Sequence, residues 1–255
     1  MKIQSLFLLA LLGMFAALDT RAASVTLTGT VRDFKAFGTP GGHADFEHFL
    51  GFDPGIVKTD LGLDGKPVYT GTAGNPTTTG ATEFDQWYRD TAGVNLSTPH
   101  SITLTELVPG SGEFVFDSPS FFPIDGMLFN TGIPGPNYHF TFELHTTFTY
   151  VPGQTFEFRS DDELWVFIDK KLAIDLGGVH GAMTGSVALD TLSLTAGSTY
   201  SLDLFFAERH TVASSFKVTT SIPLVTVPVP NAFPSVYGAM VLGLAALAPG
   251  LHRRI

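Results

Sequence analysis

Two adjacent carboxylates stand where a β-strand is expected to begin. In "EFRSDDELWVFIDKKLAIDLGGVH", residues 157–180, Asp161 and Asp162 come just before a run of strand-forming apolar residues. Aspartate is depleted in strands and neighbouring carboxylates repel each other, so this pair has a cost that something must offset. A bound cation would neutralise the two charges, whereas a solvated turn would screen them. The residues alone leave both interpretations open and favour the solvated turn.

A second group of ionisable side chains shares one face of a predicted strand. His139, Glu143 and His145 fall on the same parity of an alternating segment, a spacing that could hold a metal ion. Zinc sites need ligands that converge more closely than this, so we interpret the group as a polar sheet face or a surface packed under a loop.

Several catalytic chemistries find no support in the residues. The chain has no cysteine, which excludes thiolate catalysis and cysteine-ligated zinc. The sequence also contains no nucleophile elbow, zinc-protease helix or phosphate-binding loop. A glycosidase needs only two suitably placed carboxylates, so that class stays open. We nevertheless expect a binding or matrix protein, not an enzyme.

The segments that position these groups are predicted to be strands. In "HFTFELHTTFTYV" apolar and polar residues alternate, the period of a strand with one buried face. Its predicted inward residues are Phe140, Phe142, Leu144, Phe148 and Tyr150. In "ELWVFIDKKLAIDL" both parities are apolar until Asp169–Lys171, which predicts a buried strand, a tight hairpin and a second strand. The segment "GGVHGAMTG" that follows is interpreted as a glycine-rich loop.

The first half of the chain has a different composition. Residues 35–135 are rich in Gly, Pro, Thr and Asn, and the sequence after the N-terminal leader holds no long amphipathic helix. This excludes architectures that need crossover helices. We expect one all-β domain, a β-sandwich with a long loop-rich N-terminal elaboration. Within that elaboration, Trp87 and Tyr88 are expected to anchor a loop in the core, although they could instead stack on a sugar ring.

Bulk charge and the two ends bear on location and partners. The formal net charge of −10 over 255 residues argues against a nucleic-acid partner. Residues 1–22 have a lysine, an apolar stretch and small residues, which predicts a secretory signal peptide. Residues 227–255 resemble a PEP-CTERM sorting signal of the Val-Pro-x-Pro type, with an apolar segment and terminal Arg253 and Arg254. That resemblance implies transient membrane insertion of the tail, a sorting protease and a Gram-negative source; a simple membrane anchor is the alternative.

The region between these ends, residues 23–226, resembles the fibro-slime domain. The matching strings include "HADFEHFLGFDPGIV", "FDQWYRDTAGVN", "FRSDDELWVFIDKKLAIDLGGVHG" and "LDLFFAERHTVASSFKVTTSI", in family order. That domain is similar to the β-sandwich of anthrax protective antigen and of the yeast flocculin adhesins. The resemblance covers most of the chain from about Val31 to Ile222.

The resemblance to the flocculin-like relatives also implies a binding site. It implies that a cis peptide bond joins Asp161 to Asp162 and that both carboxylates hold Ca²⁺, which prefers oxygen ligands. The loop "AERHTVASS" would complete the site, with Glu208 as a further metal ligand. The residues expected to contact a bound glycan are His180, Arg209, His210 and Ser214.

Three functional hypotheses remain after the residues and the resemblance are considered together. The first is an exported, calcium-dependent module for carbohydrate binding or adhesion, secreted or displayed at the cell surface and associated with exopolysaccharide. The second is a structural component of the extracellular matrix without a specific ligand. The third and least favoured is a carbohydrate-active enzyme. For the first, the partner would be a polysaccharide or glycoconjugate.

Overall fold

The fold is built almost entirely from antiparallel strands. A computed structural model describes residues 22–70, 77–222 and 224. Ten strands form one continuous sheet in the order β10-β6-β12-β4-β3-β1-β5-β11-β7-β8, and β2 pairs with β9 in a small separate ribbon. The strands are β1 (Ser24–Asp33), β2 (Gly51–Phe52), β3 (Leu96–Glu106), β4 (Phe114–Ser118), β5 (Phe140–Thr149), β6 (Thr155–Asp161), β7 (Glu163–Ile168), β8 (Lys171–Leu176), β9 (Gly178–Val179), β10 (Met183–Ala188), β11 (Thr199–Glu208) and β12 (Ser215–Thr220). The helices among the described residues are α1 (Ala81–Phe84), η1 (Leu128–Asn130) and η2 (Leu189–Thr191).

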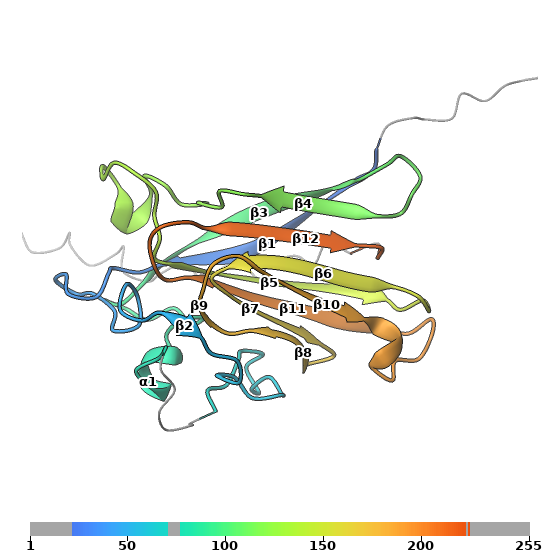
Figure 1. Ribbon diagram of the computed structural model, residues 1–255, viewed down its shortest axis with the longest axis horizontal. Coiled ribbons are helices and arrows are strands. Elements are labelled where there is room, and N and C mark those ends of the chain that lie inside the picture. Colours follow the sequence, from blue (N-terminus) through green and yellow to red (C-terminus); the bar gives the residue numbers. More distant parts are fainter. Residues whose placement is uncertain (1–21, 71–76, 223, 225–255) are drawn as a thin grey trace, which may run out of the picture.

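The ten-stranded sheet folds over into two layers (Figure 1). Strands β3 and β4 share only two paired positions, and the sheet turns at this short connection. Strands β10, β6, β12 and β4 then lie against the remaining six, and β10 at one end of the sheet also contacts β8 at the other. The predicted β-sandwich is therefore confirmed.

The core between the layers is aromatic and aliphatic. The predicted inward residues of β5 and its extension, from Phe140 to Tyr150, are all buried there, as their alternation required. Phe156 and Phe158 of β6 face them from the opposite layer. Burying apolar surface from both layers is what holds the sandwich closed.

A second hydrophobic cluster lies on the outer face of β7 and β11. Trp165, Phe167 and Phe205 point away from the main core and are covered by the N-terminal elaboration, whose Trp87 and Tyr88 are fully buried against them. The prediction that Trp87 and Tyr88 anchor a loop in the core is confirmed. Strand β7 is consequently buried on both faces, which explains why both of its parities are apolar.

The hairpin after β7 also agrees with the sequence. Strands β7 and β8 are joined by a two-residue loop, Asp169–Lys170, and both residues have positive φ, 50° and 64°. This is the conformation that matches the right-handed twist of the flanking strands.

The first-half and glycine-rich segments contain strands that the sequence did not indicate. Residues 35–135 are loop-rich as predicted, but β3 and β4 lie within them, next to each other near the middle of the sheet. Only Ile102, Leu104 and Glu106 of β3 are buried, so the strand has few large apolar residues to stand out against its Thr and Ser neighbours. The segment "GGVHGAMTG" is likewise only partly a loop, because β10 begins at Met183.

The predicted leader and tail fall largely outside the described residues. Residues 1–21 and 225–255 are not described, so the signal peptide and the sorting signal stay predictions. Within the described residues, no helix has the length and apolar character that crossing a bilayer requires.

Candidate functional site

The paired aspartates lie where the chain passes from one layer of the sandwich to the other. Asp161 is the last residue of β6, and Glu163 is the first of β7 in the opposite layer. The Asp161–Asp162 peptide bond is cis, as the resemblance implied. Strand β12 pairs with β6 through Ser215 and Asp161, so the loop between β11 and β12 reaches the same end of the sandwich.

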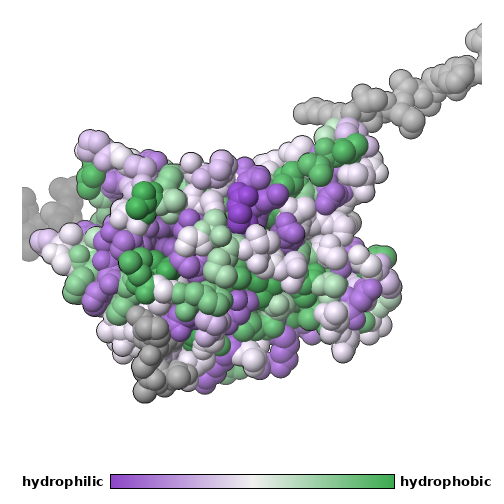
Figure 2. Space-filling view, viewed as in Figure 1, coloured by the Kyte–Doolittle hydropathy of each residue, from purple (hydrophilic) through white to green (hydrophobic). Residues whose placement is uncertain are grey.

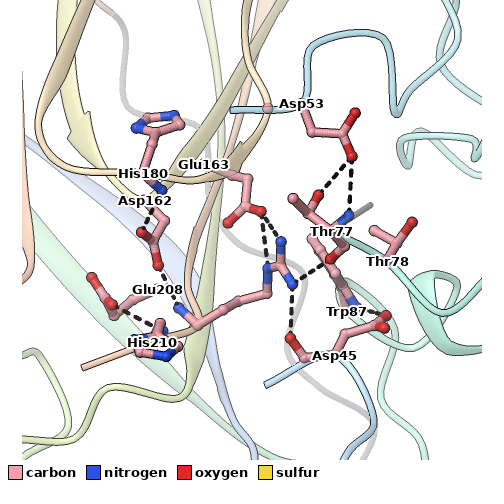
Figure 3. Close-up of polar contacts among 12 residues, drawn as sticks. Asp45, Asp53, Thr77, Thr78, Trp87, Asp162, Glu163, His180, Glu208 and His210 are labelled. Carbon is pink, nitrogen blue, oxygen red and sulfur yellow. Dashed lines mark hydrogen bonds and ion pairs between the residues drawn. The ribbon is translucent and has the colours of Figure 1, made fainter. Parts of the chain in front are cut away.

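Asp162 is held by backbone donors from two loops. Its Oδ1 accepts a hydrogen bond from the His180 backbone N–H at 3.0 Å, and its Oδ2 accepts one from the Arg209 N–H, also at 3.0 Å (Figure 3). The Asp162 side chain therefore joins the turn after β9 to the loop after β11, which fixes both loops relative to the sandwich.

The carboxyl groups around Asp162 have raised pKa values. Burial, followed by the neighbouring Glu163 charge, raises the pKa of Asp162 well above its usual range. Burial and the Asp162 charge do the same for Glu208, and burial raises the pKa of Asp161. The Ser214 hydroxyl opposes the rise at Glu208, yet no hydrogen bond of ordinary geometry reaches Glu208 Oε2. Burial thus disfavours the charged form of all three carboxyl groups.

Glu163 belongs to a different arrangement, in which a buried arginine pairs with its carboxylate. Its Oε1 accepts hydrogen bonds from Arg209 Nε, at 2.9 Å, and from Arg209 Nη2. Arg209 Nη1 donates to the backbone oxygens of Asp45 and Thr77, and the guanidinium lies 4.5 Å from the Trp87 ring centroid. These contacts tie the N-terminal elaboration to β7 and the end of β11.

The surface next to the paired aspartates is hollowed, with a volume of about 270 Å³. Asp161, Asp162, His180 and His210 line the hollow together with Leu50, Val179, Gly181, Thr211, Val212 and Ala213. Leu50 and Val212 are strongly exposed at 70% and 84%, and exposed Phe52 packs edge-to-face on His180. The hollow therefore combines carboxylates with an apolar rim.

The predicted site residues separate into two groups. Asp161, Asp162, His180 and His210 come together around the hollow. Arg209 and Ser214 are 0% and 1% exposed, and the Arg209 guanidinium is occupied by Glu163. The structure does not support the prediction that these two side chains contact a ligand at the surface.

Glu208 also differs from the expectation. It is fully buried and is not one of the residues that line the hollow. Its carboxyl is close enough to Asp162 for the two charges to interact. Within the described residues, no set of three or more His, Asp or Glu side chains is arranged to hold a metal ion unaided.

The other histidine group has ordinary partners. Glu143 forms ion pairs with Arg32 Nη1 at 3.1 Å and Lys66 Nζ at 2.5 Å, and His145 Nδ1 lies 2.7 Å from Asp203 Oδ1. The interpretation of this strand face as a surface packed under a loop agrees with these contacts, since Lys66 comes from the N-terminal elaboration.

Sequence reasoning missed one set of contacts at this end of the molecule. Glu47, in the N-terminal elaboration, accepts hydrogen bonds from the Thr211 N–H at 3.1 Å and the Thr211 hydroxyl at 2.7 Å. Its Oε2 also lies 2.9 Å from His139 Nε2. These residues are far apart in the sequence, and no local pattern marks them as neighbours.

An all-β sandwich whose loops present a carboxylate-lined hollow at one end is the class that fold and site define. Residues 129–227 match the sequence model of the PA14 domain. This match supports the broader resemblance to the protective-antigen sandwich. The narrower fibro-slime assignment stays a prediction.

Curated relatives come from Dictyostelium discoideum. The chain is 37% identical over 216 residues to protein psiD, covering 78% of this chain and 42% of psiD. It is 38% identical over 205 residues to protein psiQ, covering 73% of this chain and 20% of psiQ. The chain thus spans less than half the length of these relatives.

Solved structures show more distant likenesses. The PA14 sugar-binding domain of an RTX adhesin aligns with 77% of this chain and 90% of its own, at 10% identity and a TM-score of 0.35. The epithelial adhesin 6 A domain of Candida glabrata, in complex with Galβ1-3GlcNAc, aligns with 78% of this chain and 87% of its own. Its identity is 19% and its TM-score 0.26.

Proposed function

We propose that this protein binds carbohydrate in the hollow beside Asp161 and Asp162, with Ca²⁺ as part of the site. The observation that carries the proposal is the hollow that Asp161 and Asp162 line at a loop-built end of the sandwich. Loops on such a scaffold are common sites of binding. The PA14 match adds support, because the matched residues 129–227 include both aspartates.

Calcium suits the donors that this end of the molecule offers. Ca²⁺ takes several oxygen ligands in flexible geometry, and each Asp162 oxygen accepts only one hydrogen bond from the described residues. A cation at Asp161 and Asp162 would relieve their mutual repulsion and lower both pKa values. Two carboxylates would leave part of the coordination shell for water and for hydroxyl oxygens of a sugar.

The apolar rim would serve a different part of the ligand. Sugar rings present C–H groups on their faces, and Leu50, Phe52 and Val212 offer apolar surface beside the carboxylates. Pockets of this mixed kind bury the apolar part of a ligand while a few polar groups fix its orientation.

A glycan array measured with calcium and with a chelator tests the proposal. We expect binding that needs calcium, that Asp162→Asn abolishes and that Asp117→Asn preserves. Asp117 is a suitable control because it is a half-exposed aspartate that pairs with Arg159 on β6 and is not one of the residues lining the hollow. Metal analysis of the purified protein should find calcium in the wild type and less in Asp162→Asn. Glycan binding that persists in chelator would contradict the calcium role.

Other outcomes would favour the remaining candidates. Self-association without glycan binding would favour a structural matrix protein. Release of reducing ends from a polysaccharide would favour an enzyme, and our proposal is a binding role without catalysis.

We also propose a surface location linked to exopolysaccharide, which rests on the two predicted end signals. Mass spectrometry of the secreted protein should find a mature chain that begins after about residue 22 and ends near Pro228–Asn231. Recovery of an intact tail through Ile255 would leave the membrane-anchor alternative and remove the role of a sorting protease.

A further inference from the structure

A second and larger groove opens at the same end of the molecule. Its volume is about 720 Å³, within the range of ordinary ligand sites. The N-terminal loop after β1 and the long loop between β4 and β5 form its walls, and both lie at the end of the sandwich where the β11–β12 loop lies (Figure 1). The groove residues that matter here are Lys35, Phe129, Tyr138, His139 and Thr211.

Thr211 lines both the groove and the hollow beside the paired aspartates. Its backbone N–H and its hydroxyl both donate to the Glu47 carboxylate, which also contacts His139 in the groove wall. Thr211, which lies between the hollow and the groove, is therefore held by hydrogen bonds to the loop that contains Glu47. A ligand that is longer than the hollow can extend over Thr211 into the groove.

The groove has the chemistry of a carbohydrate site that accepts negative charge. Lys35 Nζ lies 4.8 Å from the Phe129 ring centroid, and no carboxylate in the described part of the chain pairs with it. Half-buried Tyr138 packs edge-to-face on Phe122, so its ring is held in place. Aromatic faces and a positioned ammonium are groups that a sugar ring and its carboxylate can use.

The acidic residue in the groove wall does not oppose this charge preference strongly. Both oxygens of Asp33 accept hydrogen bonds, from Asn137 Nδ2 at 2.8 Å and from the Phe129 N–H at 2.7 Å. The residue is fully buried. Lys35 is consequently the charged group in this groove that a ligand meets. In the space-filling view, small hydrophobic patches alternate with hydrophilic ones on the face shown (Figure 2).

We propose that the hollow and the groove form one extended site for an internal segment of an acidic polysaccharide, with a sugar carboxylate bound by Lys35. The proposal rests on the carbohydrate-binding function proposed above and names the class of glycan. The first sugars occupy the calcium-dependent hollow, and the chain continues over Thr211 into the groove. Continuity through Thr211 favours a long chain over a terminal sugar, and Lys35 favours an acidic chain over a neutral one.

The test is a graded set of oligosaccharides measured in calcium. The probes are short and long oligoglucuronates and their carboxyl-reduced, neutral counterparts of the same lengths. We expect the long acidic probe to bind the wild type at least about tenfold more tightly than the short one, because the two parts of the site act on one chain. The neutral probes should gain much less affinity with length.

Two variants and one control assign this gain to the groove. Lys35→Ala should remove the gain from length while leaving the short probe unaffected, and Asp162→Asn should weaken both probes. Lys58→Ala is the matched control, because Lys58 is an exposed lysine of the same elaboration that does not line the groove.

The outcomes separate this inference from the function on which it rests. Equal affinity for long and short probes, or equal behaviour of Lys35→Ala and Lys58→Ala, would overturn the extended site while calcium-dependent binding stands. Tighter binding of the neutral long probe would overturn the acidic class. Absence of binding to any probe, and to any glycan on the array, would overturn both proposals.

Discussion

Arg209 carries its charge entirely inside the protein, where Glu163 and two backbone oxygens from the N-terminal elaboration surround it. Burial alone would lower the pKa of Arg209, but the Glu163 carboxylate raises it above its usual range. Arg209 therefore keeps its positive charge. Replacing one partner would leave the other charged and unpaired in the interior.

We predict that Arg209→Met lowers the free energy of unfolding by about 3 to 5 kcal/mol, since breaking a buried pair exposes the full desolvation cost of Glu163. Arg159→Met should cost no more than about 1 kcal/mol, because the Arg159–Asp117 pair is partly exposed. Urea denaturation measures both variants. Equal losses in the two variants would show that burial of the Arg209 pair has no special weight.

Asp33 gives the protein a pH dependence of the opposite kind to that of most carboxylates. Burial raises the pKa of Asp33 from 3.8 to about 6, although hydrogen bonds from Asn137 and Phe129 oppose the rise. The folded state thus prefers the protonated acid. This contribution to stability is complete below pH 3.8 and is lost as pH rises through about 6.

We predict that the wild type loses stability relative to Asp33→Asn as pH rises from about 4 to 7, by up to about 3 kcal/mol for a shift of roughly two pKa units. The absolute stability of Asp33→Asn should be lower, because its amide N–H₂ faces a donor. The pH dependence of the difference, measured by chemical denaturation, is the readout. A difference that is flat across this range would contradict a raised pKa.

At the scale of elements, Gly29 marks the position where β1 meets β5. A methyl group at Gly29 would lie 2.2 Å from the Glu143 backbone oxygen, in the strand that pairs with β1 from the next residue onward. The backbone of β5 is fixed by its pairing with β11 and has little freedom to move. Only glycine allows this approach.

We predict that Gly29→Ala lowers the free energy of unfolding by at least about 2 kcal/mol, because overpacking against a fixed strand forces the backbone apart. Gly181→Ala should change it by less than about 1 kcal/mol, since nothing lies within 4 Å of a methyl group there. Thermal denaturation of the two variants provides the comparison. A small effect at Gly29 would mean that β1 can shift along β5.

Elements with a strong local pattern were predictable, whereas those defined by distant partners were not. The alternation in β5 and the apolar run and turn of β7–β8 follow from the period of a pleated strand and from hairpin geometry. Strand β3 escaped prediction because its Ser and Thr positions resemble the surrounding loop, and the strand is defined by pairing with β1. Burial of Arg209 could not be inferred either, because its partners Glu163 and Asp45 lie far from it in the sequence. All three residues are of polar types that are usually exposed.

The candidate site shows the same division. The repulsion between Asp161 and Asp162 was evident because the two residues are neighbours in the sequence. The resemblance to the flocculin-like relatives then led to the hypothesis that they bind calcium. The Glu47–Thr211 contact and the groove around Lys35 depend on three loops meeting at one end of the sandwich. No spacing within a single segment encodes such a meeting.

At the scale of the whole molecule, the N-terminal elaboration and the sandwich share one buried interface. Trp87 belongs to the elaboration and Trp165 to β7, and their ring centroids lie 6.2 Å apart in the second hydrophobic cluster. Each indole N–H donates to a carboxylate, Trp87 to Asp45 and Trp165 to Asp175. Arg209, next to the end of β11, crosses the same interface through its hydrogen bonds to the backbone oxygens of Asp45 and Thr77. Apolar burial and hydrogen bonds from a buried arginine therefore couple the two parts.

We predict that the elaboration and the sandwich unfold together in one transition. The only two tryptophans of the chain allow each part to be followed alone, because Trp165→Phe leaves Trp87 as the fluorescent reporter and Trp87→Phe leaves Trp165. Each variant should lose stability with its indole hydrogen bond, yet in each the fluorescence and far-ultraviolet circular dichroism transitions should coincide, as two-state unfolding requires. If Trp87 fluorescence changed at a lower urea concentration than the circular dichroism signal, the elaboration would be a separate, weaker unit. Both depressions at the binding end would then depend on a part that opens before the sandwich does, since Leu50 and Lys35 come from that elaboration.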